Sequence, residues 1–153
     1  MLRVQQATGQ RLGGLYIDRL ELLGDVKGAS SDDLRLATTR AAVALQDLAK
    51  ELQIPILCLV QLSRDIERRG DRVPRKSDVR EAGAIEEVAT VMMLFEHQVF
   101  EDLGGVQYRW LHVVKNMHGQ CGALPLAFLP YATTFREVTD AELQSLRAAR
   151  VQG

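Results

Sequence analysis

The feature that most constrains the fold is a strand–helix–strand succession in the N-terminal part of the chain. Residues 15–18 begin with a short apolar run, and the continuously apolar residues 56–60 follow Pro55. Between these runs, apolar side chains recur at steps of three and four over residues 34–52, which predicts one long amphipathic helix. This succession is typical of a parallel sheet with a crossover helix. We therefore predict an α/β fold with a mostly parallel sheet flanked by helices, in which residues 56–60 are buried on both faces.

The rest of the chain predicts shorter elements, ending in a β-hairpin and a helix. In order, we expect a helical turn at 84–89, a buried strand at 91–95, hairpin strands at 106–115 and 122–129, and an edge strand at 133–138. Thr139 and Glu142 have the spacing of a capping box that opens the final helix, and Ser31 has the position of a cap for the long helix. We read residues 1–153 as a single partial domain, with a core over 13–138 and a C-terminal helix over 139–153.

Composition and charge bound the classes of function. The chain has 153 residues, of which 46% are hydrophobic and 25% charged, as in an ordinary globular domain. Its net charge of −1 excludes a chain that is basic overall, so any nucleic-acid surface must be local. The loop 64–80 is such a local surface, with seven basic and four acidic residues.

The sequence favours a cytoplasmic protein with no membrane contact. The N-terminus lacks an apolar signal core, and no apolar run approaches the roughly 20 residues of a membrane span. Cys58 and Cys121 lie far apart and form no metal-binding pattern, so we expect a reduced thiol at Cys58.

Polar side chains follow both strands of the predicted parallel pair. Asp18 ends the first strand, and Gln61 follows the second. Ligands of parallel sheets bind beyond the carboxyl ends of the strands. In nucleotide hydrolases of the P-loop class an acid there holds Mg²⁺, and an amide beside it could sense the γ-phosphate. The alternative is that both residues simply face water at strand ends.

Several stretches in the same order resemble one family. They are GLYIDRLELL, QLSR with the basic loop and SDVREAGAIEE, VMMLFEH, VVKNMHGQCGALPLAF and TTFREV. In these stretches the chain resembles the C-terminal ATPase domain of the DnaB-type replicative DNA helicases, a hexameric RecA-like family. The resemblance implies a partial RecA-like P-loop NTPase core with a C-terminal β-hairpin. It also implies ATP-dependent unwinding of duplex DNA in replication, with ATP and Mg²⁺ as cofactors.

The resemblance implies a role for individual residues. Asp18 matches the Mg²⁺-coordinating acid, Gln61 the γ-phosphate-sensing glutamine, and Lys115 a lysine that reaches the neighbouring subunit's nucleotide. Residues 75–86 match a loop of the family that touches single-stranded DNA. Within it, Arg80, Glu81 and Gly83 match the residues that contact the DNA phosphates. A glycine allows close backbone approach, and an arginine suits a phosphate. Without the resemblance, residues 75–86 would read as a solvated loop that caps a short helix.

The sequence departs from the family in places that matter for catalysis. These 153 residues contain no GxxxxGK[ST] motif, which would cradle the nucleotide phosphates, and the family's upstream catalytic glutamate is missing with it. Met117 stands where the family has an arginine that acts on the adjacent subunit's γ-phosphate. Arg19 follows Asp18 where an aromatic residue is usual. We therefore expect no measurable ATPase from the chain alone.

These departures leave more than one function open. The first is a fragment of a DnaB-like helicase domain that works in a hexameric ring or with a chain that supplies the missing N-terminal half. The second is a non-catalytic RecA-like module for assembly or weak single-stranded DNA binding. A third is another RecA-like ATPase, such as a recombinase or clock-type protein, against which the SDVREAGAIEE stretch argues. Unpaired strand edges favour self-association or a partner.

Overall fold

The computed structural model describes residues 9, 11–30, 33–69, 73–96 and 105–151. The contacts divide the chain into two compact units, each described by itself below. The first unit comprises Met1–Ser63 with Val79–Ala89, and the second comprises Arg64–Asp78 with Thr90–Gly153. The predicted cap at Ser31 lies outside the described residues. Among the described helices, none combines the length and hydropathy needed to cross a bilayer.

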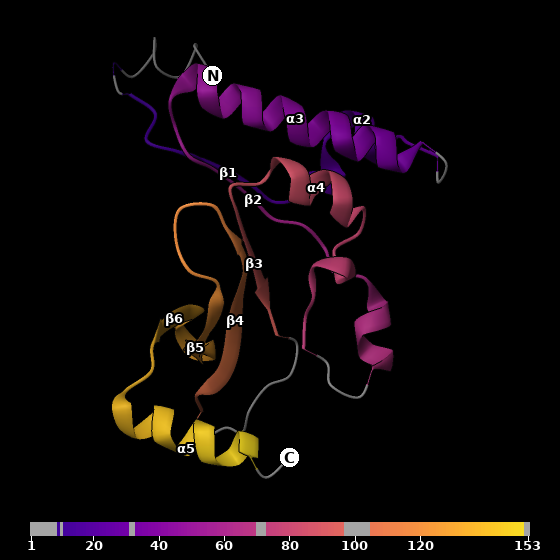
Figure 1. Cartoon of the computed structure of the whole chain (residues 1–153). Helices are drawn as coiled ribbons and strands as arrows, with labels where there is room; N and C mark the ends of the chain where they lie inside the picture. Colours follow the sequence, from indigo (N-terminus) through magenta and orange to yellow (C-terminus); the bar gives the residue numbers. More distant parts are fainter. Residues whose placement is uncertain (1–8, 10, 31–32, 70–72, 97–104, 152–153) are drawn as a thin grey trace. The chain divides into compact units, whose positions relative to one another are not determined.

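The first unit is built on a parallel pair of strands, as predicted. Strand β1 (Leu15–Ile17) pairs with β2 (Ile56–Cys58), with Leu15 opposite Ile56 and Ile17 opposite Cys58. The crossover between them contains the helix α3 (Leu34–Leu52), drawn in purple in Figure 1. The predicted strand–helix–strand succession is therefore confirmed. Short helices lie between β1 and α3: η1 (Leu20–Leu22) and α2 (Gly24–Lys27).

Helix α3 ends where the backbone leaves the helical conformation. Gln53 adopts a left-handed φ of 53°, and its backbone N–H caps the helix on the carbonyl of Ala49. Pro55 follows and cannot continue the helical hydrogen bonds. The helix α4 (Ala82–Val88) packs on α3, where the side-chain amide of Gln46 donates to the carbonyl of Val88 at 2.9 Å.

The prediction that residues 56–60 are buried on both faces is wrong for the described structure. Leu57 is 45% exposed and Leu59 is 51% exposed. Successive side chains of a strand point to opposite faces, and α3 contacts β2 from one of them. In this strand, a continuously apolar sequence therefore does not indicate that both faces are buried.

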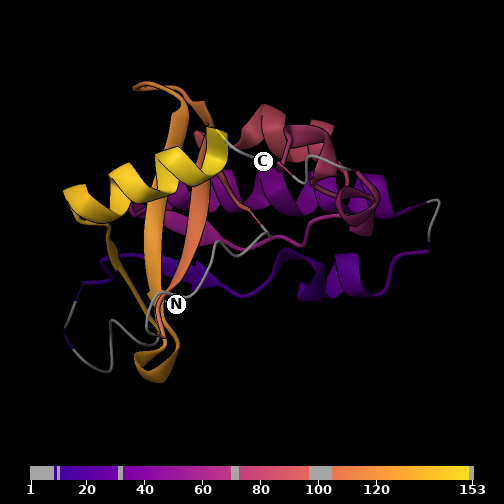
Figure 2. The same ribbon diagram turned by 90° about the horizontal axis from the view of Figure 1, so that it is seen from below.

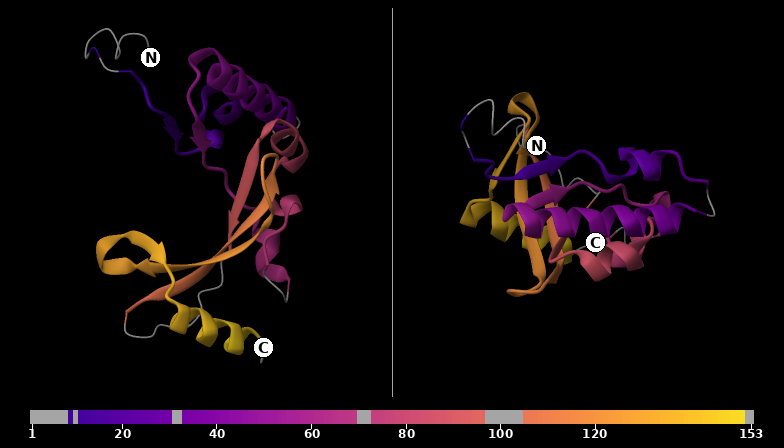
Figure 3. Two further views of the ribbon diagram at one scale, coloured as in Figure 1. Left: turned by 60° about the vertical axis from the view of Figure 1, so that its left-hand side comes forward. Right: turned by 90° about the horizontal axis from the view of Figure 1, so that it is seen from above.

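The second unit contains a four-stranded antiparallel sheet in the order β3-β4-β5-β6. Its strands are β3 (Val91–Phe95), β4 (Gln107–Asn116), β5 (Gly122–Leu129) and β6 (Thr134–Glu137). The predicted hairpin is confirmed as β4 and β5, which are long and curved in Figure 3. The rings of Phe95 on β3 and Phe135 on β6 stack with centroids 5.3 Å apart, although these strands are the two edges of the sheet. The sheet therefore curls strongly.

This sheet changes the predicted balance of strand pairing. The fold is α/β as predicted, but only β1 and β2 pair in parallel among the described strands. The expected buried strand at 91–95 lies antiparallel to β4. Its burial alternates, since Met92 and Leu94 are 6% and 4% exposed whereas Met93 is 47% exposed. The apolar run could not reveal this alternation because both faces carry apolar residues. The remaining short helices of this unit are η2 (Arg64–Arg68), η3 (Lys76–Asp78) and η4 (Pro130–Ala132).

Helix α5 (Asp140–Val151) covers one face of this sheet and lies across its strands in Figure 2. Leu146 of α5 packs against Tyr108 of β4 and Ala127 of β5, and all three are buried. The predicted capping box opens the helix: the Thr139 N–H donates to Glu142 Oε2 at 2.8 Å, and the Glu142 N–H donates to Thr139 Oγ1 at 3.4 Å.

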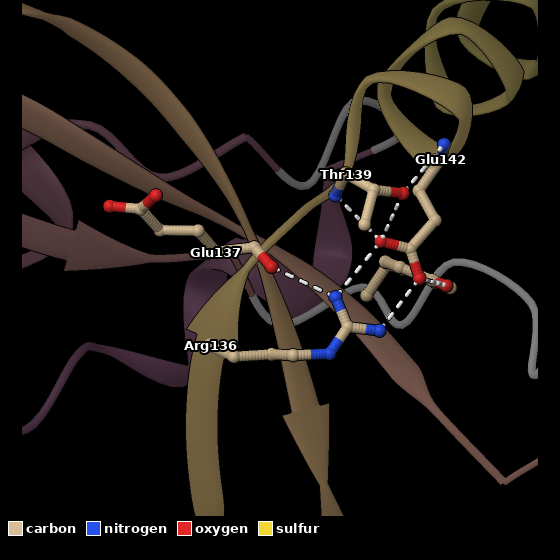
Figure 4. A network of polar contacts seen from close by, with 5 residues as sticks. Arg136, Glu137, Thr139 and Glu142 are labelled. Carbon is tan, nitrogen blue, oxygen red and sulfur yellow. Dashed lines mark hydrogen bonds and ion pairs between the residues drawn. The ribbon is translucent and has the colours of Figure 1, made fainter.

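Glu142 also binds residues of the sheet, as Figure 4 shows. The Arg136 guanidinium donates to both carboxylate oxygens, at 2.9 and 2.7 Å, and the Tyr108 hydroxyl donates to Oε1 at 2.6 Å. The bonds from Arg136, followed by that from Tyr108, hold the pKa of Glu142 well below its usual range. Burial, together with the bond to Glu142, raises the pKa of Tyr108.

We expect Glu142→Gln to lower the free energy of unfolding at neutral pH by about 1 kcal/mol, mainly because a neutral amide replaces the carboxylate that accepts charge-assisted bonds from Arg136. A depressed folded-state pKa stabilises the fold above the unfolded-state value near 4.5, and this stabilisation is lost as the pH falls through the folded-state value. The difference from wild type should therefore shrink below pH 4.5. Urea unfolding followed by the fluorescence of Trp110, the single tryptophan, measures it. Glu137→Gln, at an exposed position of β6, is the matched control, and a Glu142→Gln deficit that is unchanged in acid would contradict the expectation.

Candidate functional site

The two predicted strand-end residues lie at the same edge of the parallel pair. Asp18 directly follows β1 and is exposed, and Gln61 lies three positions beyond the end of β2. Backbone bonds continue the pairing past the strands, since the Leu59 N–H donates to Ile17 at 2.9 Å and the Leu20 N–H donates to Leu59 at 2.9 Å. Because the strands are parallel, the carboxyl ends of β1 and β2 lie at the same edge, where ligands of such sheets bind.

Two further residues hold Gln61 in place. The Arg19 Nη1 donates to Gln61 Oε1 at 2.8 Å, and the Gln61 backbone N–H donates to Glu21 Oε1 at 2.8 Å. Both come from the turn after β1, so one turn fixes both the backbone and the side chain of Gln61. Sequence reasoning gave neither residue a role. The available signal was their place beside Asp18, within one turn of a strand end.

Two carboxylates of this edge could serve as ligands of a metal ion that is held mainly by a nucleotide. Asp18 offers one exposed carboxylate, and Glu21 Oε2 is buried without a hydrogen-bond partner among the described residues. Within the described ranges, no group of three or more His, Cys, Asp or Glu could hold a metal by itself. Mg²⁺ is usually bound through one or two carboxylates plus substrate phosphates and water, so these residues fit it in that form.

The surroundings of the edge are apolar on the strand face. A pocket of about 110 Å³ is lined by Asp18 and four apolar side chains, those of Tyr16, Ile17, Leu57 and Leu59. Such a lining does not suit a phosphate chain.

Burial, with a contribution from Glu21, raises the pKa of the Cys58 thiol, so this cysteine stays protonated at neutral pH.

The residues predicted to face DNA surround the start of α4. Arg80 is exposed in the preceding turn, and Glu81 has a left-handed φ of 57° at the N-cap position. Gly83 lies in the first turn, and a Cβ built there would meet no atom within 4 Å. Among the described residues, nothing therefore requires a glycine at this position, which is exposed.

The basic loop before α4 is braced by a buried acid. Asp78 is 5% exposed and accepts from Arg69 Nη2 at 2.6 Å and from the Arg75 N–H at 2.7 Å. An antiparallel bridge between Leu62 and Val79 joins the segments that flank this loop. Asp78 thus neutralises one of the basic charges counted in the sequence. The predicted DNA segment 75–86 includes residues of both units.

The hairpin residues of interest belong to the second unit. Lys115 lies on β4 opposite Met92, and Met117 lies just beyond β4 with 65% exposure. The Met117 N–H donates to the Thr90 carbonyl at 3.1 Å, and the next N–H, of His118, donates to Asn116 Oδ1 at 3.1 Å. Met117 is therefore fixed by its backbone while its side chain faces outward.

A family comparison decides the identity of this arrangement. The model of the DnaB-like helicase C terminal domain matches residues 1–137, which is most of the chain. The chain belongs to this family. The predicted resemblance is confirmed, and the alternative of a recombinase or clock-type ATPase is disfavoured. Helix α5 lies beyond the residues that the DnaB-like model matches.

Curated relatives agree with the DnaB-like assignment. The replicative DNA helicase DnaB of Haemophilus influenzae is 39% identical over 131 residues, which are 82% of this chain and 27% of that protein. The replicative DNA helicase DnaC of Bacillus subtilis is 33% identical over 129 residues, 83% of this chain and 28% of that protein. The chain thus spans about a quarter of the length of these relatives.

Solved structures confirm the fold. A DnaB-like replicative helicase, described with its interactions with primase, has a TM-score of 0.75 at 25% identity and covers 90% of this chain and 34% of its own. A further ATPase domain has a TM-score of 0.72 at 23% identity, over 90% of this chain and 50% of its own, and shows the fold alone. The predicted RecA-like class is confirmed.

Proposed function

We propose that this chain is the metal-binding and phosphate-sensing part of an ATP-driven DnaB-like helicase domain that unwinds duplex DNA in replication. The observation that carries the proposal is the position of Asp18 and Gln61 beyond the ends of the parallel neighbours β1 and β2, at one carboxyl edge. Asp18 would hold Mg²⁺, which neutralises charge on the nucleotide phosphates when it is bound. The Gln61 amide would contact the terminal phosphate of ATP and so distinguish ATP from ADP.

The rest of the nucleotide site would come from residues outside this sequence. These 153 residues hold no GxxxxGK[ST] loop, so the backbone cradle for the phosphates must be supplied by another segment or another chain. Lys115, on the hairpin, would serve the nucleotide of a neighbouring subunit in a hexameric ring. Both compact units would then belong to one domain, with the nucleotide-facing residues in the first and the hairpin in the second.

The start of α4 would contact single-stranded DNA. Arg80 is exposed and offers a guanidinium to a phosphate, and the open backbone at Gly83 allows a strand to approach closely. Glu81 would orient the turn between them. One subunit offers few such contacts, so binding by the isolated chain should be weak and sensitive to salt.

A second candidate is a non-catalytic RecA-like module that assembles or binds single-stranded DNA without hydrolysis. The observation in its favour is Met117, an uncharged and exposed side chain in the position of the family's trans-acting arginine. Such an arginine contributes roughly 10³–10⁵ in rate because it neutralises charge in the transition state.

Filter binding of the chain to single-stranded DNA tests the DNA part of the proposal. We expect affinity to fall with rising salt, and Arg80→Ala to reduce the slope of log affinity against log salt by about 0.7, the value for one phosphate contact on a single strand. Arg40→Ala, at an exposed position of α3, is the matched control for loss of one charge. Equal salt slopes for wild type and Arg80→Ala would remove Arg80 from the DNA site.

A further inference from the structure

Arg19 is the described residue of the carboxyl edge whose side chain donates a hydrogen bond to the side-chain amide of Gln61. Its Nη1 lies 2.8 Å from Gln61 Oε1, although the two residues are 42 positions apart in sequence. The contact is possible because β1 and β2 are parallel neighbours, which brings the residues after both strands to one edge. Arg19 is also the residue immediately after Asp18.

The chemistry of the guanidinium fixes the orientation of the Gln61 amide. An arginine side chain has five N–H donors and no acceptor, so only the amide oxygen can face it. The amide NH₂ group is therefore turned away from Arg19. Glu21 holds the other end, because its Oε1 accepts the Gln61 backbone N–H at 2.8 Å. An exposed glutamine, whose amide would otherwise rotate, is thus presented as a hydrogen-bond donor in one direction.

Arg19 also keeps its charge available for an anion. Among the described residues it forms no ion pair, and the hydrogen bond that it makes goes to a neutral amide. Asp18 and Glu21 flank it in sequence, but the hydrogen bond to Glu21 Oε1 comes from the Gln61 backbone. A planar guanidinium with N–H groups to spare matches the geometry of phosphate oxygens.

We propose that Arg19 is a positioning residue that fixes Gln61 as a donor toward the terminal phosphate of a nucleoside triphosphate and places a cation in cis beside Asp18. The inference rests on the proposed nucleotide function and deepens it. Arg19 would give the edge a positive charge from its own chain. Met117, at the position where the family has an arginine, carries no charge. The ligand class is a nucleoside triphosphate with Mg²⁺, in preference to the diphosphate.

Nuclear magnetic resonance of the ¹⁵N-labelled chain tests this inference, because it measures weak binding without turnover. The probes are ATP, ADP and tripolyphosphate, each with Mg²⁺. We expect the Gln61 side-chain NH₂ signals to respond more strongly to ATP and tripolyphosphate than to ADP. Arg19→Met should weaken binding of ATP with Mg²⁺ by about 10-fold, as expected for the loss of one charge-assisted contact, and change ADP binding by less than about twofold. Arg40→Met is the control for charge, since Arg40 is exposed on α3.

A double-mutant cycle separates positioning from an independent contribution. If Arg19 acts through Gln61, Arg19→Met should have little further effect in a Gln61→Met background, because coupled residues are not additive. Arg19→Lys keeps the charge but not the planar fork, so it should recover part of the ATP preference. Without any ligand, Arg19→Met should also shift the Gln61 NH₂ signals and increase their mobility, an effect that a merely stabilising arginine would not produce.

The outcomes distinguish the inference from the function on which it rests. A wild-type chain in which Gln61 does not respond to ATP overturns the proposed nucleotide site and this inference together. A wild-type response that Arg19→Met leaves unchanged, or strictly additive effects in the cycle, overturns the inference alone and leaves the nucleotide site standing.

Discussion

Replacing His112 with alanine should lower the free energy of unfolding of the second unit by about 3 kcal/mol, the upper end of the cost of removing a hydrogen-bond partner from a buried polar group. His112 Nε2 lies 2.9 Å from Glu96 Oε2, and the two side chains are 11% and 2% exposed. The substitution removes a partner from a buried carboxylate that water cannot readily replace. Urea unfolding followed by Trp110 fluorescence is a local probe, since the Glu96 N–H donates to the Trp110 carbonyl at 2.8 Å.

A second histidine of the same strand–turn region gives the matched control. His118 is exposed, so His118→Ala should change stability by less than about 0.5 kcal/mol. Glu96→Gln keeps the shape of the pair and a hydrogen-bonding group, so its effect should be intermediate. Equal and small losses for His112→Ala and His118→Ala would show that the buried pair contributes no more than a surface contact.

The elements that the sequence predicted well are those set by local chemistry. The period of apolar residues over 34–52 reflects one buried stripe of a helix, and the helix spans Leu34–Leu52. The capping box of Thr139 and Glu142 involves atoms three residues apart and forms as predicted. Such features depend on neighbours in the chain, so a single sequence carries them.

The burial of β2 and β3 could not be predicted, because it depends on residues that are distant in the sequence. The runs ILCLV and VMMLF are apolar at every position, whether one or both faces are covered. Leu57 and Met93 are nevertheless 45% and 47% exposed. A sheet face is covered by elements that are distant in the sequence. The antiparallel partner of β3 is likewise a later element, the hairpin strand β4.

The candidate site divides in the same way. The position of Asp18 and Gln61 at one edge could be predicted from the sequence, because the carboxyl ends of neighbouring parallel strands lie at the same edge of a sheet. Their contacts were not, since Arg19 and Glu21 reach Gln61 across 42 and 40 positions. The contacts of Asp78 within the basic loop were not predicted either, because a count of charges does not show which of them are paired.

Methionine in the position of the trans-acting arginine leads to the prediction with the largest effect. Consider a chimera in which residues 1–137 replace the matching segment of the Haemophilus influenzae DnaB helicase, which is 39% identical. By family, the remainder of that helicase supplies the phosphate-binding loop. In this chimera Met117→Arg should raise DNA-stimulated ATP hydrolysis at least about 100-fold, below the roughly 10³–10⁵ of an optimally placed arginine. The 65% exposure of Met117 allows the larger charged side chain without burial.

The controls separate a placed cation from charge in general. Gln120→Arg puts the same charge on an exposed position of the same turn and should bring no comparable gain, and Met117→Gln should leave the rate low. Asp18→Asn should abolish turnover in the Met117→Arg chimera, because it removes the proposed ligand of Mg²⁺. The chain alone should show no turnover with or without the arginine, since the loop is supplied by the relative. If the unmodified chimera hydrolyses ATP as fast as the parent helicase, or if the arginine brings no gain, then Met117 does not limit the rate of hydrolysis.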